Sequence, residues 1–416
     1  MRIGLPPALR HRRFFWLWLG LLLSITGSQM QLWALFWHVR QLSPNPIAVS
    51  VIGAARFTPI VLLSLLGGVV ADRYSRRKVL FATQSTSMLV AFGLWALTAS
   101  GKLELWHIYL LTAIQAMTMA FDTPARQSLV PNLVPPQDLP SAFSLQSIAF
   151  NTGSILGPAL SGMVIGYWGQ EYTYLLNAVS FLAVLLALIG IGPLPQRAGG
   201  LSDFRSALLD GREGIRFIRR QPIILSSMIL DFFATFFSSA NTLLPYVARD
   251  ILHVNEIAYG WLAAAQSIGA LMAGLIFSQL QLVKKQGPLL VTAVLIFGLA
   301  TIFFGLADTF PLVFLALVLL GASDSVSTIL RNTMRQLLTP DDLRGRMTSI
   351  NQIFFIGGPQ LGEVEAGAVA QAFGVPFAIL SGGIGCILAT LLVVKIWPQL
   401  LHYNGDEPLR AITHAL

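Results

Sequence analysis

The chain has 416 residues, of which 55% are hydrophobic and only 11% are charged, whereas soluble proteins carry about a quarter charged residues. So apolar a chain of this length excludes a soluble protein and indicates a membrane protein with many spans. The net charge of +8 does not indicate nucleic-acid binding, because the basic residues lie in short segments between apolar runs, where they serve membrane topology.

A helix needs about 20 mostly apolar residues to cross the hydrocarbon core. The sequence contains twelve such segments and lacks the alternation of a β-barrel, so we expect an all-α membrane protein. The first apolar run follows a basic stretch, as in a signal peptide, but it is longer and has no clear cleavage site, so we expect it to be retained. The predicted spans are Phe14–His38, Ile47–Val70, Lys78–Ala99, His107–Val130, Leu139–Trp168, Tyr172–Leu194, Pro222–Ala248, Ile257–Val283, Pro288–Ala307, Phe310–Thr333, Thr348–Phe373 and Val375–Trp397.

The distribution of Lys and Arg predicts the orientation of these spans. With both termini in the cytoplasm, most of the 27 basic residues lie on the inner side, including those around Arg331–Arg346. The longest hydrophilic segment, 195–221, then divides an N-terminal six-helix bundle (1–194) from a C-terminal one (222–397), which a cytoplasmic tail (398–416) follows. Apolar residues alternate with arginines in this linker. It is either a basic amphipathic helix on the anionic inner leaflet or a solvated connection.

The two halves of the sequence resemble each other. Pro136–Leu139 recurs about 200 residues later as Pro340–Leu343, and Asn151–Pro158 is echoed loosely by Phe355–Pro359. An internal repeat of this length in a protein of twelve spans predicts two pseudo-symmetric bundles that face a central cavity.

A polar turn between the second and third spans stands out. Its glycines allow close helix packing, and its cations place it on the inner side. Positive-inside charge does not explain Asp72, which we expect to meet a helix of the other bundle near Arg346–Thr348, while the arginines reach Asp122. We therefore predict an inner gate that consists of Gly68, Asp72, Arg73, Arg76, Arg77, Asp122 and Arg126.

This turn has the pattern G-x-x-x-D-R-x-x-R-R and resembles the signature loop of the major facilitator superfamily, with Ser75 at the position of the usual glycine. In span five, Gly153, Gly157, Pro158 and Gly162 resemble the antiporter motif of exporters in this superfamily, with Ser161 as a departure. Pro158 predicts a kink there. An ordinary small-residue packing face is the alternative for these residues taken alone.

Two further segments, Asp122–Gln127 and Gly357–Glu363, resemble the branch that contains the enterobactin exporter and macrolide efflux proteins. The resemblance covers essentially the whole chain. It implies a proton-coupled antiporter in a bacterial inner membrane that exports drugs or siderophores by alternating access. We expect no enzyme activity and no cofactor, with the proton gradient as the energy source. The oligomeric state is open, with a monomer as the default expectation.

Several charges lie inside the predicted spans, where each costs about 2.5–3.5 kcal/mol at a helix centre. They are Arg56 in span two, Asp231 in span seven, Asp324 in span ten and Glu363 in span eleven. A proton carrier needs a carboxylate that binds and releases a proton under the control of a nearby cation. We expect Asp231 or Asp324 to be the proton site, modulated by Arg56, with Glu363 as a further candidate. A fixed salt bridge is the alternative.

Aromatic and amide side chains are the expected lining of the substrate cavity, because apolar pockets with a few polar groups suit amphiphilic substrates. A single aromatic residue here is more often a core or lipid-facing residue than a substrate contact, and the amides are stronger candidates. The predicted lining residues are Gln29, Trp33, Phe36, Trp37, Gln115, Gln146, Phe236, Asn241, Gln266 and Asn351.

Other functions are less consistent with the sequence. No G-x-x-x-x-G-K-[ST] loop is present, which argues against an ATP-driven exporter, and the six histidines show no metal-ligand spacing. A lipid or lysophospholipid flippase with the same fold remains open. The substrate class is set by a few cavity side chains and does not follow from the fold.

Overall fold

The structure is a computed structural model that describes residues 6–192, 214–280, 283–340 and 343–405. The chain divides into two compact units. Unit 1 comprises 1–44, 54–203 and 254–264, and unit 2 comprises 45–53, 204–253 and 265–416. Two helices, α2 (Pro46–Arg73) and α10 (Glu256–Ser278), therefore contribute to both units.

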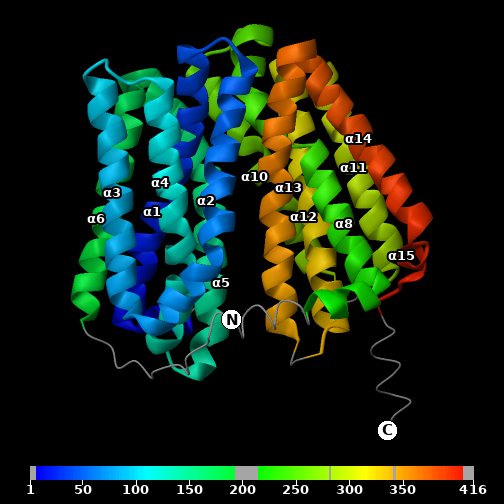
Figure 1. Ribbon diagram of the computed structural model, residues 1–416, viewed down its shortest axis with the longest axis horizontal. Coiled ribbons are helices and arrows are strands. Elements are labelled where there is room, and N and C mark those ends of the chain that lie inside the picture. Colours follow the sequence, from blue (N-terminus) through cyan, green and yellow to red (C-terminus); the bar gives the residue numbers. More distant parts are fainter. Residues whose placement is uncertain (1–5, 193–213, 281–282, 341–342, 406–416) are drawn as a thin grey trace. The chain divides into compact units, whose positions relative to one another are not determined.

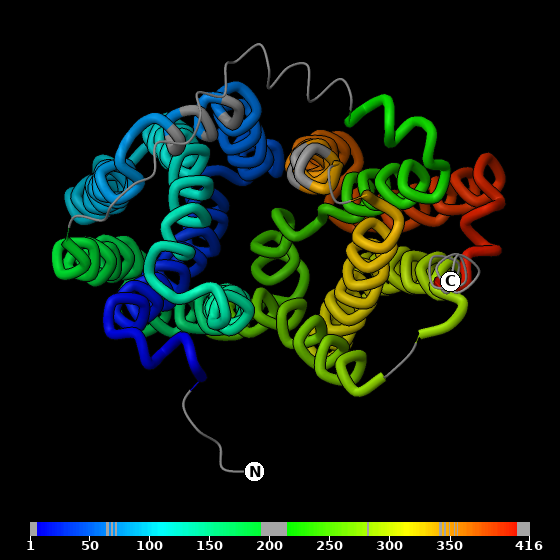
Figure 2. The backbone as a smooth tube through the Cα atoms, turned by 90° about the horizontal axis from the view of Figure 1, so that it is seen from below, coloured from blue at the N-terminus to red at the C-terminus, as the bar shows by residue number. Residues whose placement is uncertain are grey.

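Unit 1 is built from long helices that run alongside one another (Figures 1 and 2). Helix α1 packs against α5 and α6, and α3 packs against α4 and α6. Small residues and leucines fill the contacts among these helices, and Phe14, Leu17 and Leu188 are almost fully buried. The helices are α1 (Arg12–Leu42), α3 (Arg76–Ala99), α4 (Leu105–Leu129), α5 (Leu139–Trp168) and α6 (Gln170–Ile191), besides most of α2.

Unit 2 repeats this pattern of neighbours. Helix α8 packs against α13 and α14, and α11 packs against α12 and α14. The same pattern of helix contacts therefore occurs in both units, as an internal repeat would produce. The helices are α8 (Pro222–Phe237), α9 (Leu244–Tyr246), α11 (Gln286–Leu306), α12 (Phe310–Leu338), α13 (Arg344–Phe373), α14 (Val375–Ile396) and α15 (Gln399–His402), besides most of α10.

Within the described residues, each of the twelve predicted spans overlaps a helical segment, while parts of two of them, 193–194 and 281–282, lie outside the described residues. Ten of these segments are long and apolar enough to cross a membrane. Helices α4 and α13 are long but are not among the ten, and they carry polar residues such as Gln115, Asp122, Asn351 and Glu363.

The predicted span Pro222–Ala248 lies within a segment, Pro222–Ile251, that is long and apolar enough to cross a membrane, but this segment is not one regular α-helix. Helix α8 ends at Phe237, and a 3-10 turn, α9 and a π-helical turn (Val247–Ile251) continue the chain. The hydroxyl groups of Thr235 and Ser239 donate hydrogen bonds to the carbonyls of Asp231 and Thr235, each four residues earlier. Such bonds compete with the regular helix ladder and bend helices, which fits a break at this point.

Candidate functional site

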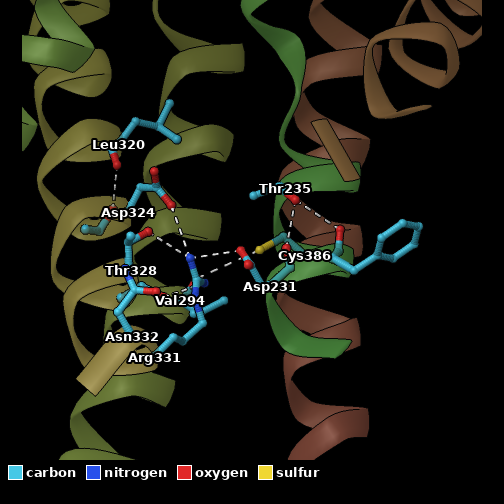
Figure 3. A network of polar contacts seen from close by, with 12 residues as sticks. Asp231, Thr235, Val294, Leu320, Asp324, Thr328, Arg331, Asn332 and Cys386 are labelled. Atoms are coloured by element: carbon cyan, nitrogen blue, oxygen red, sulfur yellow. Dashed lines mark hydrogen bonds and ion pairs between the residues drawn. The ribbon is translucent and has the colours of Figure 1, made fainter. Parts of the chain in front are cut away.

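A buried ion pair joins two helices of unit 2. Arg331 on α12 places its Nη2 atom 2.8 Å from Oδ1 of Asp231 on α8, and the two side chains are only 2% and 1% exposed (Figure 3). Two buried charges are tolerated when they are paired and further hydrogen bonded. Ser327 and Thr328, one turn earlier on α12, accept hydrogen bonds from Arg331 at 2.8 and 2.9 Å.

A second carboxylate approaches the same guanidinium group. Oδ1 of Asp324 lies 3.9 Å from Nη2 of Arg331, and its side chain is 39% exposed (Figure 3). Asp324 precedes Arg331 by two helical turns, so both side chains lie on one face of α12. One arginine is therefore shared between a fully buried acid and a partly exposed acid.

A second buried arginine extends this polar face by one further turn. Arg335 is 3% exposed and donates hydrogen bonds to the side-chain oxygens of Asn332, at 2.6 Å, and of Asn351 on α13. Asp231, Asp324, Arg331 and Arg335 together carry no net charge when all four are ionised. We call these four residues the α8–α12 charge cluster.

Arg331 and Arg335 are not cytoplasmic topology charges, so their prediction as such is wrong. Helix α12 continues to Leu338, and both arginines are buried within unit 2. The available signal was the spacing along α12, because Asp324, Arg331 and Arg335 recur on one helix face.

The other predicted coupling residues lie elsewhere. Arg56 is half-buried on the part of α2 that belongs to unit 1, whereas the charge cluster belongs to unit 2. Glu363 is half-buried on α13, where a side chain built on Gly53 of α2 would come within 2.6 Å of its Oε2 atom. A role of Arg56 or Glu363 in coupling stays a prediction.

Asp122 of the predicted inner gate is the centre of a polar cluster in unit 1. Its Oδ1 atom accepts hydrogen bonds from Thr83 at 2.9 Å and Gln84 at 2.7 Å, both on α3, and its Oδ2 atom forms an ion pair with Arg126. The carboxylate is buried and fastens α3 to α4.

The arginines of the turn bind helix ends. Arg76 donates to the carbonyl of Ser128 at 2.8 Å, and Arg77 donates to the carbonyl of Leu188 at 2.6 Å. These carbonyls lie in the last turns of α4 and α6, where cations are favoured. Arg73 is exposed. The surroundings of Gly68, the side chain of Asp72 and the predicted contact at Arg346 are outside the described residues.

The glycines of span five are sites of close helix contact. A Cβ atom on Gly157 would lie 2.5 Å from Cβ of Gln29 on α1, and one on Gly153 would lie 2.7 Å from Ile25 of the same helix. A Cβ atom on Gly162 would meet the backbone of Glu256, at the start of α10, at 2.5 Å. Pro158 lies inside α5, which is helical throughout.

The predicted cavity amides other than Gln146 find partners within their own units. Gln115 donates to Ser87 at 3.0 Å, Gln29 reaches Ser154 at 3.5 Å, and Asn241 donates to Gln266 at 2.8 Å. Asn351 accepts from Arg335, and Gln146 is half-buried.

The predicted aromatic residues pack against other rings. Trp33 and Trp37 contact Tyr259, with ring centroids 6.2 and 4.8 Å apart, and Phe36 packs edge-on against Trp33. Phe236 stacks on Phe232 at 6.0 Å. Contact of any of these aromatic or amide residues with a substrate remains a prediction.

The sequence reasoning missed two buried polar pairs between α1 and α6. Asn177 donates to Gln31 at 2.8 Å, and the imidazole of His38 lies 3.0 Å from the hydroxyl of Tyr174. Buried polar groups need such partners. Neither α6 residue lies in a recognisable motif, so only the packing of α1 on α6 shows the pairs.

Known proteins extend these observations. The sequence model of the transmembrane secretion effector family matches residues 4–405. The chain belongs to this family of the major facilitator superfamily. Members are membrane transporters, and the chain is a multi-pass membrane protein of that class, not an enzyme.

The chain is 26% identical over 362 residues to the enterobactin exporter EntS of Escherichia coli K12, and this alignment covers 87% of this chain and 85% of the exporter. The EntS protein of Shigella dysenteriae serotype 1 gives the same identity and coverage.

Solved transporter structures share the fold of this chain. A bacterial homologue of the human lysosomal transporter Spinster superposes with a TM-score of 0.71 at 15% identity, covering 97% of this chain and 98% of that one. A bacterial homologue of the iron transporter ferroportin gives 0.68 at 19% identity, covering 92% and 98%. The nucleoside transporter NupG gives 0.70 at 14% identity, covering 94% and 99%. The fold is therefore that of a major facilitator transporter.

Proposed function

We propose that this family member is a proton-coupled exporter of amphiphilic small molecules in a bacterial inner membrane, working by alternating access. The family description and the similarity to an enterobactin exporter support outward transport. In this proposal all twelve helical segments span the membrane, including α4 and α13, and both termini lie in the cytoplasm. The substrate is a drug-like or siderophore-like amphiphile.

The observation that carries proton coupling is Arg331 shared between Asp231 and Asp324. A proton on Asp324 would remove one negative charge from the cluster. Arg331 would then form an ion pair with Asp231 only. Loss of that proton would draw the guanidinium group back toward Asp324. Because charges in an apolar interior interact strongly, one proton can shift the balance between two arrangements of α8 and α12.

Dye efflux from cells that overproduce the protein tests the proposal. Asp324→Asn should abolish efflux driven by an imposed proton gradient, because the amide cannot carry a proton. Asp308→Asn, at an exposed loop position before α12, is the matched control and should transport normally. Coupling at this cluster would be refuted if two variants both retain normal proton-driven efflux. These are the single variant Asp324→Asn and the double variant Asp231→Asn/Asp324→Asn.

A collapse of the proton gradient separates the proposal from a flippase. An ionophore should stop dye efflux at once if export is coupled to protons. Transport of a fluorescent lysophospholipid that continues after the gradient collapses would instead support a lipid flippase with this fold.

A further inference from the structure

A short basic helix precedes the first long helix of unit 2. Residues 214–220 are helical, and α8 begins at Pro222. In Figure 2 this helix is the green segment that follows the long grey trace at the top of the view. Two of its apolar residues face inward: Ile218 is 4% exposed and packs with Ile224 and Met228 of α8, and Phe217 packs against the same cluster.

The opposite side of this helix carries three exposed arginines. Arg216, Arg219 and Arg220 are spaced as neighbours on one helix face, and with the exposed Ile215 they line a pocket of about 310 Å³. The buried side fixes the direction of the helix, so the guanidinium groups gather at one place on the surface. Guanidinium groups bind phosphate oxygens through paired N–H donors.

An apolar pocket lies next to this helix in sequence, because its first lining residue, Ile223, follows Arg220 by three positions. It has a volume of about 330 Å³ and is lined by Ile223, Leu338, Pro398, Gln399, His402 and Tyr403. Helix α8 starts here, and α12 ends here, so the pocket lies at the end of the apolar spans. In a bilayer that α8 and α12 span, this end of the helices would lie at the boundary between headgroups and acyl chains.

We propose that this surface, the three arginines and the adjacent apolar pocket, binds an acidic phospholipid. The arginines take the headgroup phosphate, and the pocket takes the first part of an acyl chain. A soluble anion would need only the arginines, and a zwitterionic lipid would bring its own cation to the phosphate. The proposal does not depend on the coupling mechanism or on the exported substrate.

Thermal unfolding of the purified full-length protein in detergent tests this site. Added phosphatidylglycerol should raise the unfolding temperature, whereas phosphatidylcholine and inorganic phosphate should not. The triple variant Arg216→Gln/Arg219→Gln/Arg220→Gln should bind phosphatidylglycerol roughly a hundredfold more weakly, because each arginine near an anionic surface contributes roughly fivefold. The matched control is Arg10→Gln/Arg12→Gln/Arg13→Gln, which removes three exposed arginines from the start of unit 1 and should respond like the parent.

A second variant distinguishes loss of lipid binding from loss of folding. Arg216→Lys/Arg219→Lys/Arg220→Lys keeps the charge and the apolar side of the helix, and should retain part of the phosphatidylglycerol response. Equal stabilisation by phosphatidylcholine, stabilisation by inorganic phosphate alone, or equal losses in both glutamine triples would overturn the proposal.

Discussion

Arg331 carries a full charge where almost none of its side chain reaches solvent. Its hydrogen bonds to Ser327 and Thr328 hold it at the level of Asp231. We expect Arg331→Gln to destabilise the protein by about 3–5 kcal/mol, because Asp231 is left as an unpaired buried charge. Thermal unfolding in detergent measures this loss.

The double variant Asp231→Asn/Arg331→Gln supplies the control for this prediction. It removes both charges and should recover much of the stability, since no buried charge remains unpaired. If the double variant is as unstable as the two single losses added together, the ion pair makes no specific contribution.

The Asp122 carboxylate holds unit 1 together through acceptor atoms alone. Thr83, Gln84 and Arg126 all donate to it. In Asp122→Asn the charge is lost and an amide N–H₂ group replaces one acceptor, so we expect a loss of about 1–3 kcal/mol in thermal unfolding. Asp138→Asn is the comparison, because its pair with His11 is partly exposed and should contribute about 1 kcal/mol or less. Equal effects of the two variants would contradict this ranking.

At the level of helices, the close contact of α5 with α1 depends on glycine. A Cβ atom on Gly157 would lie 2.5 Å from Gln29 and 2.9 Å from the carbonyl of Thr26. We expect Gly157→Ala to cost about 1–3 kcal/mol through overpacking. Gly93→Ala on α3 should be neutral or slightly stabilising, because its Cβ atom would meet only Leu111 methyl groups at 3.9 Å and alanine favours helix. Apparent unfolding temperatures of both variants, measured together, check this difference.

The positions of the helices could be predicted from the sequence in large part. Hydropathy predicts where most of the long helices lie, because a membrane span needs about 20 mostly apolar residues. It does not predict the break after Phe237, which depends on hydrogen bonds of Thr235 and Ser239.

The candidate site was predicted in part. Asp231 and Asp324 stand out as charges in apolar runs, but their cation does not. Arg331 lies near the end of a span, where a positive charge has an ordinary topological explanation. Its pairing with Asp231, about 100 residues away in sequence, requires the packing of α8 beside α12.

At the scale of the whole chain, the repeated pattern of helix neighbours in the two units agrees with the family assignment. The proposed topology alternates its loops between the two sides of the membrane. Lys102 and Asp308 then lie outside, whereas Lys78 and Lys285 lie inside, and all four are exposed.

Cysteine labelling in intact cells tests this arrangement, because the single native cysteine, Cys386, is buried and should not react. We expect a membrane-impermeant maleimide to label Lys102→Cys and Asp308→Cys in intact spheroplasts, and Lys78→Cys and Lys285→Cys only after permeabilisation. The parent chain is the background control. Since each helical span reverses the side of the next loop, failure of α4 to cross would move every later loop, including those at Lys285 and Asp308, to the other side. Labelling of Asp308→Cys only after permeabilisation would therefore show that α4 does not span.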